Sequence, residues 1–159
     1  MDELLTLEPG DRLVVVGVGS DLRGDDAAGV LVARRLAEQE SDRLHVVEGG
    51  TAPENYTAVV KSFDPDHVLL VDAVEFGGDP GEVKPVDPAE LAQTSFSSHA
   101  YPLTLLTDYL ERETGATITM LGIQPASINE SEDLSPAVET AIERVVEEIA
   151  TALSRSTPS

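Results

Sequence analysis

The chain of 159 residues contains no cysteine. Disulfide bonds, a thiolate nucleophile and cysteine-ligated zinc are therefore excluded. Its apolar runs are far shorter than the roughly 20 residues that cross a bilayer. The first residues, MDELLTLEPGD, are acidic and lack the basic and then apolar pattern of a secretory signal. With a length that suits one domain, these absences predict a cytoplasmic protein with a single domain over residues 1–159 and a core over about 12–153.

Basic residues are scarce in this chain. Ten Lys and Arg residues face 30 Asp and Glu residues, which gives a formal net charge of −20. Such a field repels nucleic acids and anionic membranes, so neither is an expected partner, and repulsion between copies favours a monomer at low salt. The acidic residues recur along the whole chain, as on a solvated surface. Because salt at ~1 M shortens the screening length to about 3 Å, we expect a halophilic protein from a salt-rich cell.

Several motifs of nucleotide and hydrolase chemistry are missing as well. The dinucleotide-binding pattern G-x-G-x-x-G fails, because Leu22 stands where the third glycine belongs after Gly17 and Gly19. The carboxylates of Asp25 and Asp26 would also repel a pyrophosphate at this turn, so a nucleotide-binding Rossmann-like domain is the weaker alternative. The sequence has no G-K-[ST], H-E-x-x-H, G-x-S-x-G or D-[ST]-G.

What the chain does have is an alternation of apolar, β-branched runs with helical patterns. Strands are expected over 12–18, 44–50, 66–74 and 116–125, with a polar, proline-bounded edge strand over 80–88. Helices are expected over 25–40 and 54–63, from about residue 102, and from Pro136 with Ser135 as its N-cap. Strands that are apolar on both faces and alternate with helices predict an α/β fold with a mostly parallel sheet covered on both sides.

Side chains that can bind a cation follow the ends of these strands. Asp25 and Asp26 follow the first strand, and Gly49 and Gly50 end the second. Asp72 lies near the end of the third strand. Because open α/β sheets bind ligands outside the carboxyl ends of their strands, we expect these residues to gather at one edge. A buried carboxylate such as Asp72 is costly unless it is hydrogen-bonded or bound to a cation.

A histidine completes a possible ligand set. His99 lies in the segment FSSHAYPL, just before the helix expected from about residue 102. Two carboxylates and one imidazole would bind a divalent transition metal and leave positions open for a substrate. Each residue also has a simpler interpretation: one of Asp25 and Asp26 as a helix cap, Asp72 satisfied by hydroxyls or by a helix N-terminus, and His99 as a turn residue. Spacing alone leaves both interpretations open.

Taken together, these motifs resemble the nickel–iron hydrogenase maturation endopeptidases. The matching segments are GVGSDLRGDDAAG (17–29), GGTAPEN (49–55), LLVDA (69–73), SSH (97–99) and LGIQP (121–125). They follow the family's order from about residue 12 to residue 150 and are most similar to the branch that processes hydrogenase-3-type large subunits. One residue departs from the pattern, because Ser20 stands where the family usually has asparagine after its second glycine.

The resemblance implies a three-layer αβα sandwich with a twisted, mostly parallel five-stranded sheet. It also implies a hydrolase, an aspartic-type or metal-assisted endopeptidase. Such an enzyme removes the C-terminal extension of a hydrogenase large-subunit precursor once nickel has been inserted. The nickel would come with the substrate, and no organic cofactor is implied. A docking or chaperone module that binds a metalloenzyme without cleaving it is the alternative, and it is favoured if Ser20 disables catalysis.

Site residues can be carried over from the family by position. Asp26, Asp72 and His99 are then the implied catalytic residues and contacts of the metal. Gly49–Gly50 is the implied substrate-binding segment, where missing side chains permit close backbone approach. Asp25 would be a structural partner or a cap.

A salt titration tests the halophilic interpretation. We expect the melting temperature to rise steeply as KCl is raised toward about 1 M, because salt screens the repulsion among acidic side chains. Thermal unfolding followed by circular dichroism measures this directly. A melting temperature that does not change with KCl would contradict the interpretation.

Overall fold

The structure is a computed structural model that describes residues 4–20, 24–90, 100–126 and 133–158. Its strands form one five-stranded sheet in the order β2-β1-β3-β5-β4. The parallel strands are β1 (Leu13–Val18), β2 (Leu44–Gly50), β3 (His67–Ala73) and β5 (Thr117–Ile123). The edge strand β4 (Val83–Val86) pairs antiparallel with β5. The predicted α/β class and the mostly parallel sheet are confirmed.

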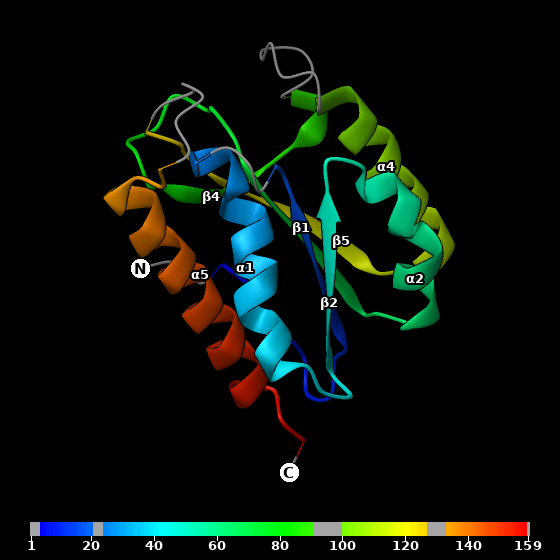
Figure 1. Cartoon of the computed structure of the whole chain (residues 1–159). Coiled ribbons are helices and arrows are strands. Elements are labelled where there is room, and N and C mark those ends of the chain that lie inside the picture. Colours follow the sequence, from blue (N-terminus) through cyan, green and yellow to red (C-terminus); the bar gives the residue numbers. More distant parts are fainter. Residues whose placement is uncertain (1–3, 21–23, 91–99, 127–132, 159) are drawn as a thin grey trace.

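Helices cover both faces of this sheet (Figure 1). One face carries α1 (Ala28–Leu36), with short 3-10 helices η1 (Gly24–Ala27) and η2 (Ala37–Gln39) at its ends, together with α5 (Pro136–Arg155). The other face carries η3 (Pro53–Tyr56), α2 (Thr57–Ser62) and α4 (Ala100–Thr114). The helix expected over 25–40 is thus helical as far as Gln39, with a tighter 3-10 turn at each end. Each helix in the described segments is too short or too polar to traverse a bilayer.

Side chains alternate between the two faces of the sheet along each strand, and an apolar core lies on each face. Leu13 and Val15 of β1 face the layer of α1 and α5, whereas Val14 and Val16 face the layer of α2 and α4. Register places Leu13 opposite both Leu44 of β2 and His67 of β3, so the parallel strands start level with one another. Their carboxyl ends therefore meet at one edge of the sheet, which lies at the top of Figure 1.

Two glycines allow α1 to lie very close to the sheet. A Cβ atom on Gly29 would lie 2.0 Å from the carbonyl oxygen of Val71 and 2.4 Å from that of Val18. A Cβ atom on Gly17 would lie 2.4 Å from the carbonyl oxygen of Gly29. Real Cβ atoms do not tolerate such distances, so this contact requires glycine at both positions. The start of α1 is thereby pressed against β1 and β3, and η1 lies beside the end of β3.

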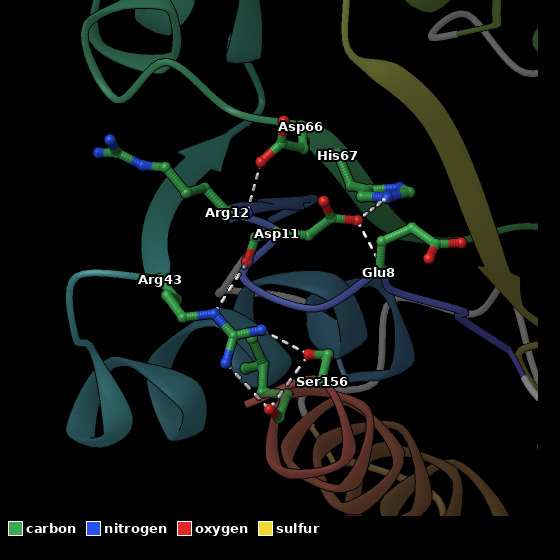
Figure 2. A network of polar contacts seen from close by, with 8 residues as sticks. Glu8, Asp11, Arg12, Arg43, Asp66, His67 and Ser156 are labelled. Atoms are coloured by element: carbon green, nitrogen blue, oxygen red, sulfur yellow. Dashed lines mark hydrogen bonds and ion pairs between the residues drawn. The ribbon is translucent and has the colours of Figure 1, made fainter. Parts of the chain in front are cut away.

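The opposite, amino edge of the sheet is held by a polar network around Arg43 (Figure 2). The Arg43 Nε atom donates to the carbonyl oxygen of Asp11 at 3.1 Å, and its Nη1 atom donates to that of Leu153 at 3.2 Å. Its Nη2 atom donates to the Ser156 hydroxyl. The Asp11 Oδ2 atom lies 2.9 Å from His67 Nε2. The network joins the N-terminal segment, β2 and β3 to the last turn of α5, where a positive charge is favourable.

Replacing Arg43 tests how much this network stabilises the fold. We expect Arg43→Ala to lower the free energy of unfolding by about 2–3 kcal/mol, because hydrogen bonds from a partly buried charged donor are lost. Urea unfolding at fixed KCl measures the change. Arg112→Ala is the matched control, because Arg112 is exposed and makes one long bond of 3.4 Å to a backbone oxygen. Equal losses in the two variants would contradict the assignment.

Candidate functional site

Buried polar side chains gather at the carboxyl edge of the sheet. Within the described segments four polar side chains are buried, and three of them lie at this edge: Asp25, Asp72 and Gln124, with exposed fractions of 7%, 6% and 3%. Burial of a polar group is costly unless hydrogen bonds or an opposite charge compensate for the lost water. A side chain whose burial is fully compensated by hydrogen bonds within the protein has a structural role. One whose burial is not compensated in this way is a candidate for a functional role.

The cost of burying Asp25 is compensated by hydrogen bonds within the protein. Its Oδ1 atom accepts from the Ser135 backbone N–H at 2.8 Å, and its Oδ2 atom accepts from the Ala126 N–H at 2.9 Å and the Ser135 hydroxyl at 3.0 Å. The carboxylate thus ties η1 to the segment after β5 and to the start of α5. Of the two roles expected for Asp25, these bonds support the structural partner, and the role of helix cap is wrong because Ala27 is the N-cap of α1. Ser135 holds the expected N-cap position of α5 but makes no side-chain capping bond.

Both the oxygen and the nitrogen of the Gln124 side-chain amide make hydrogen bonds within the protein. Its Oε1 atom accepts from the backbone N–H groups of Phe76 and Gly78, each at 3.0 Å. Its Nε2 atom donates to Glu75 Oε2 at 2.6 Å and to the Pro125 carbonyl oxygen at 3.3 Å. Gln124 therefore shapes the segment that follows β3. This role of Gln124 was not predicted from the sequence, although an amide side chain between an apolar strand and a proline is a signal that could have suggested it.

The burial of Asp72 is compensated by far fewer interactions within the protein. It lies near the end of β3, opposite Gly122 of β5. Burial is the main cause that raises the pKa of Asp72 well above its usual value, and the nearby charge of Asp26 raises it further. A hydrogen bond from the Ala73 backbone acts in the opposite direction. In the part of the chain that the structure describes, no lysine, arginine or histidine forms an ion pair with Asp72 or with the partly exposed Asp26.

Gly19 lies close to both acids and is joined to Gly50. The Gly19 N–H donates to the Gly50 carbonyl oxygen at 2.9 Å, which joins the turns after β1 and β2. A Cβ atom on Gly19 would lie 2.2 Å from the Asp26 carbonyl oxygen and 3.6 Å from Asp72 Oδ1. Gly50 is partly exposed, has a φ of +60°, and would keep a Cβ atom 4.0 Å from the nearest atom.

Gly49 differs from its neighbour Gly50. It is buried, and a Cβ atom there would lie 3.0 Å from Pro53 Cβ and 3.1 Å from Val16 Cγ1. Glycine at this position is therefore explained by packing inside the protein. The assignment of Gly49 and Gly50 to substrate binding stays a prediction.

The structure brings together two members of the predicted ligand trio. Asp26 and Asp72 interact at the carboxyl edge, whereas His99 lies outside the described residues and directly precedes Ala100, the first residue of α4. The residues that are described contain no group of three or more His, Asp or Glu side chains able to hold a metal ion. The metal and catalytic assignments of the trio thus stay predictions. Two carboxyl groups that lie near enough for one to raise the pKa of the other can take part in binding a divalent cation.

Comparisons with known proteins agree on one family. The family model of hydrogenase maturation proteases matches residues 30–152. The chain is 34% identical over 137 residues to the hydrogenase 3 maturation protease of Escherichia coli K12, covering 86% of this chain and 87% of that protein. The crystal structure of a NiFe hydrogenase maturation protease from Thermococcus kodakarensis superposes with a TM-score of 0.82 at 39% identity, covering 91% of this chain and 94% of that one.

Asp72→Asn tests whether Asp72 costs stability. Because folding raises its pKa, the carboxyl group contributes stability that is fully present below its unfolded pKa of about 3.9 and is lost as the pH rises through the folded pKa. The neutral amide avoids that loss, so we expect the variant to be more stable than the parent at about pH 8 and similar to it at about pH 4.

Urea unfolding of both proteins at fixed KCl measures the difference. Asp42→Asn, at an exposed loop position, is the control and should show no such gain. A variant of Asp72 that is less stable than the parent at the higher pH would contradict the burial argument.

Proposed function

This chain belongs to the hydrogenase maturation protease family, and we propose that it removes the C-terminal extension from the large-subunit precursor of a nickel–iron hydrogenase. Members of the family are peptidases, so the chain is a hydrolase by class. The observation that carries the proposal is the pair Asp26 and Asp72. A buried carboxyl group with a raised pKa lies beside a second carboxylate, and neither has a basic partner among the described residues. A cation carried by the substrate would relieve this repulsion.

Nickel belongs to the substrate in this proposal and acts as a recognition element. Asp26, Asp72 and His99 would engage the nickel region of the precursor directly or through water, since carboxylate and imidazole groups suit this metal. A precursor without nickel would leave the two carboxylates uncompensated and would bind in the productive position less well. Cleavage is thereby restricted to precursors that have received their metal.

Hydrolysis of the extension needs an activated water molecule and a polarised carbonyl group. Asp26 is the more exposed of the two acids, and we assign it the role of base toward water. Asp72, with its raised pKa, would hold a proton beside the leaving amine if it contacts the nickel through water rather than directly. The nickel of the substrate supplies an alternative route, as a Lewis acid at the carbonyl oxygen. Gly50, which is partly exposed and joined to Gly19 by a backbone hydrogen bond, would let the backbone of the extension approach closely.

A non-cleaving docking module is the second candidate function, and Ser20 is the residue that favours it. The family usually has asparagine here, so an amide donor is lost beside Gly19. Such a module would bind the same precursor and leave its mass unchanged. For either function we place the protein in the cytoplasm as a monomer that needs no organic cofactor.

Incubation with purified precursor, prepared with and without nickel, tests the proposal by mass spectrometry. We expect the nickel-loaded precursor to lose its C-terminal extension and the nickel-free precursor to keep it. Asp72→Asn and His99→Ala should each lower the rate at least about 100-fold while the melting temperature shows an intact fold.

Two control variants show whether a loss of cleavage is specific to the candidate site. Asp42→Asn changes an exposed loop aspartate, and His45→Ala changes a histidine that stacks on Phe63 near the amino edge. Both should cleave like the parent. Normal cleavage by Asp72→Asn and by His99→Ala would show that the site is misassigned, and binding with unchanged precursor mass would favour the docking module.

A further inference from the structure

Exposed apolar side chains lie on one helical layer. Within the described residues the exposed large hydrophobic side chains are Tyr56, Val59, Leu105 and Tyr109, with exposed fractions of 37%, 42%, 56% and 39%. All four belong to η3, α2 and α4, and we call them the α2–α4 patch. The described parts of α1 and α5, on the other face of the sheet, expose no large hydrophobic side chain of this kind.

The four side chains of the α2–α4 patch lie on neighbouring helical turns. Leu105 and Tyr109 are four residues apart on α4, and a spacing of four places side chains on the same face of a helix. Figure 1 shows α2 and α4 side by side, and the two helices contact each other. Lys61 at the end of α2 pairs with Glu113 of α4 at 3.0 Å and also interacts with Tyr109. The patch therefore spans the seam between the helices.

Two segments of this layer contain no charged residue, in an otherwise strongly acidic chain. A quarter of all residues are charged and the net charge is −20, yet residues 55–60 and 100–107 contain no Asp, Glu, Lys or Arg. These two segments include most of η3 and α2 and the first two turns of α4. The cores of protein–protein interfaces are depleted of charged side chains and enriched in tyrosine. The composition is therefore that of a contact surface.

The α2–α4 patch is continuous with the candidate site. Pro53 of η3 packs against Gly49, with 3.0 Å between its Cβ atom and the position of a Cβ on Gly49. α4 begins at Ala100, directly after His99. Leu70 of β3 faces the layer of α2 and α4, so alternation along the strand directs Asp72 to that side as well. A macromolecule that places its chain end at Asp72 would lie over this layer.

We propose that the α2–α4 patch docks the folded body of the hydrogenase large-subunit precursor while its C-terminal extension enters the site at Asp26 and Asp72. This inference rests on the proposed function. A second copy of this chain is a poor occupant at low salt, because two chains with a net charge of −20 repel each other. A contact made by apolar and tyrosine side chains also holds in concentrated salt, which weakens ion pairs.

Steady-state cleavage of the nickel-loaded precursor tests the docking surface. The double variant Val59→Asn/Leu105→Asn makes two exposed side chains polar. We expect its KM to rise at least about 10-fold, with kcat within about twofold of the parent, since docking precedes cleavage and does not alter the reacting groups. Thr140→Asn/Thr151→Asn on α5 is the matched control, at exposed positions on the other face, and should leave both constants unchanged.

The outcomes distinguish this inference from the proposed function. If the parent cleaves the precursor and the patch variant has an unchanged KM, the docking surface is overturned and the proposed function stands. If the parent cleaves no precursor, both are overturned. Sedimentation of the parent checks for a second copy: a dimer that the patch variant abolishes, with KM unchanged, would overturn the inference in favour of self-association. Circular dichroism verifies folding, and the single variant Leu105→Asn serves if the double variant unfolds.

Discussion

The contact between α1 and the sheet, made through Gly17 and Gly29, is the constraint on which the candidate site depends. Because the backbone of Gly29 lies against the carbonyl groups of Val18 and Val71, the start of α1 is held at the ends of β1 and β3. This close packing leaves η1 beside the end of β3, so Asp26 is brought to Asp72. Asp25, the neighbour of Asp26, fixes the same turn to Ser135 and Ala126. Backbone packing thus places two acids from separate elements in one location.

The buried polar groups at the carboxyl edge of the sheet are of two kinds, which differ in how the cost of burial is compensated. Asp25 and Gln124 have their hydrogen-bonding atoms satisfied by the chain itself, so their burial strengthens the loops around the site. Asp72 is buried near a like charge and receives a bond from one neighbouring backbone group. A group that lowers stability in this way persists in proteins where function requires it. In our account that function is to meet a positively charged feature of the substrate, delivered by a partner that rests on the α2–α4 patch.

The sequence predicted most of the fold and part of the site. Apolar runs fixed the strands, and strand-end geometry placed Asp26 and Asp72 at one edge, because these features follow from local periodicity and the rules of parallel sheets. The partners of Asp25 escaped prediction because they lie 101 and 110 positions away in the chain. The role of Gln124 and the packing reason for Gly49 also depend on segments that meet only in the folded molecule. His99, predicted from a turn motif, lies outside the described residues.

The most direct test of this account is the titration of Asp72 itself, followed by NMR of ¹³C-labelled aspartate carboxyl groups at fixed KCl. Comparison with Asp72→Asn assigns its signal. We predict that Asp72 titrates well above the ordinary range of aspartate, and that its pKa falls toward that range when Asp26 is replaced by asparagine. An ordinary pKa for Asp72, unchanged by the loss of Asp26, would contradict the claim that the buried Asp72 and the partly exposed Asp26 form one site.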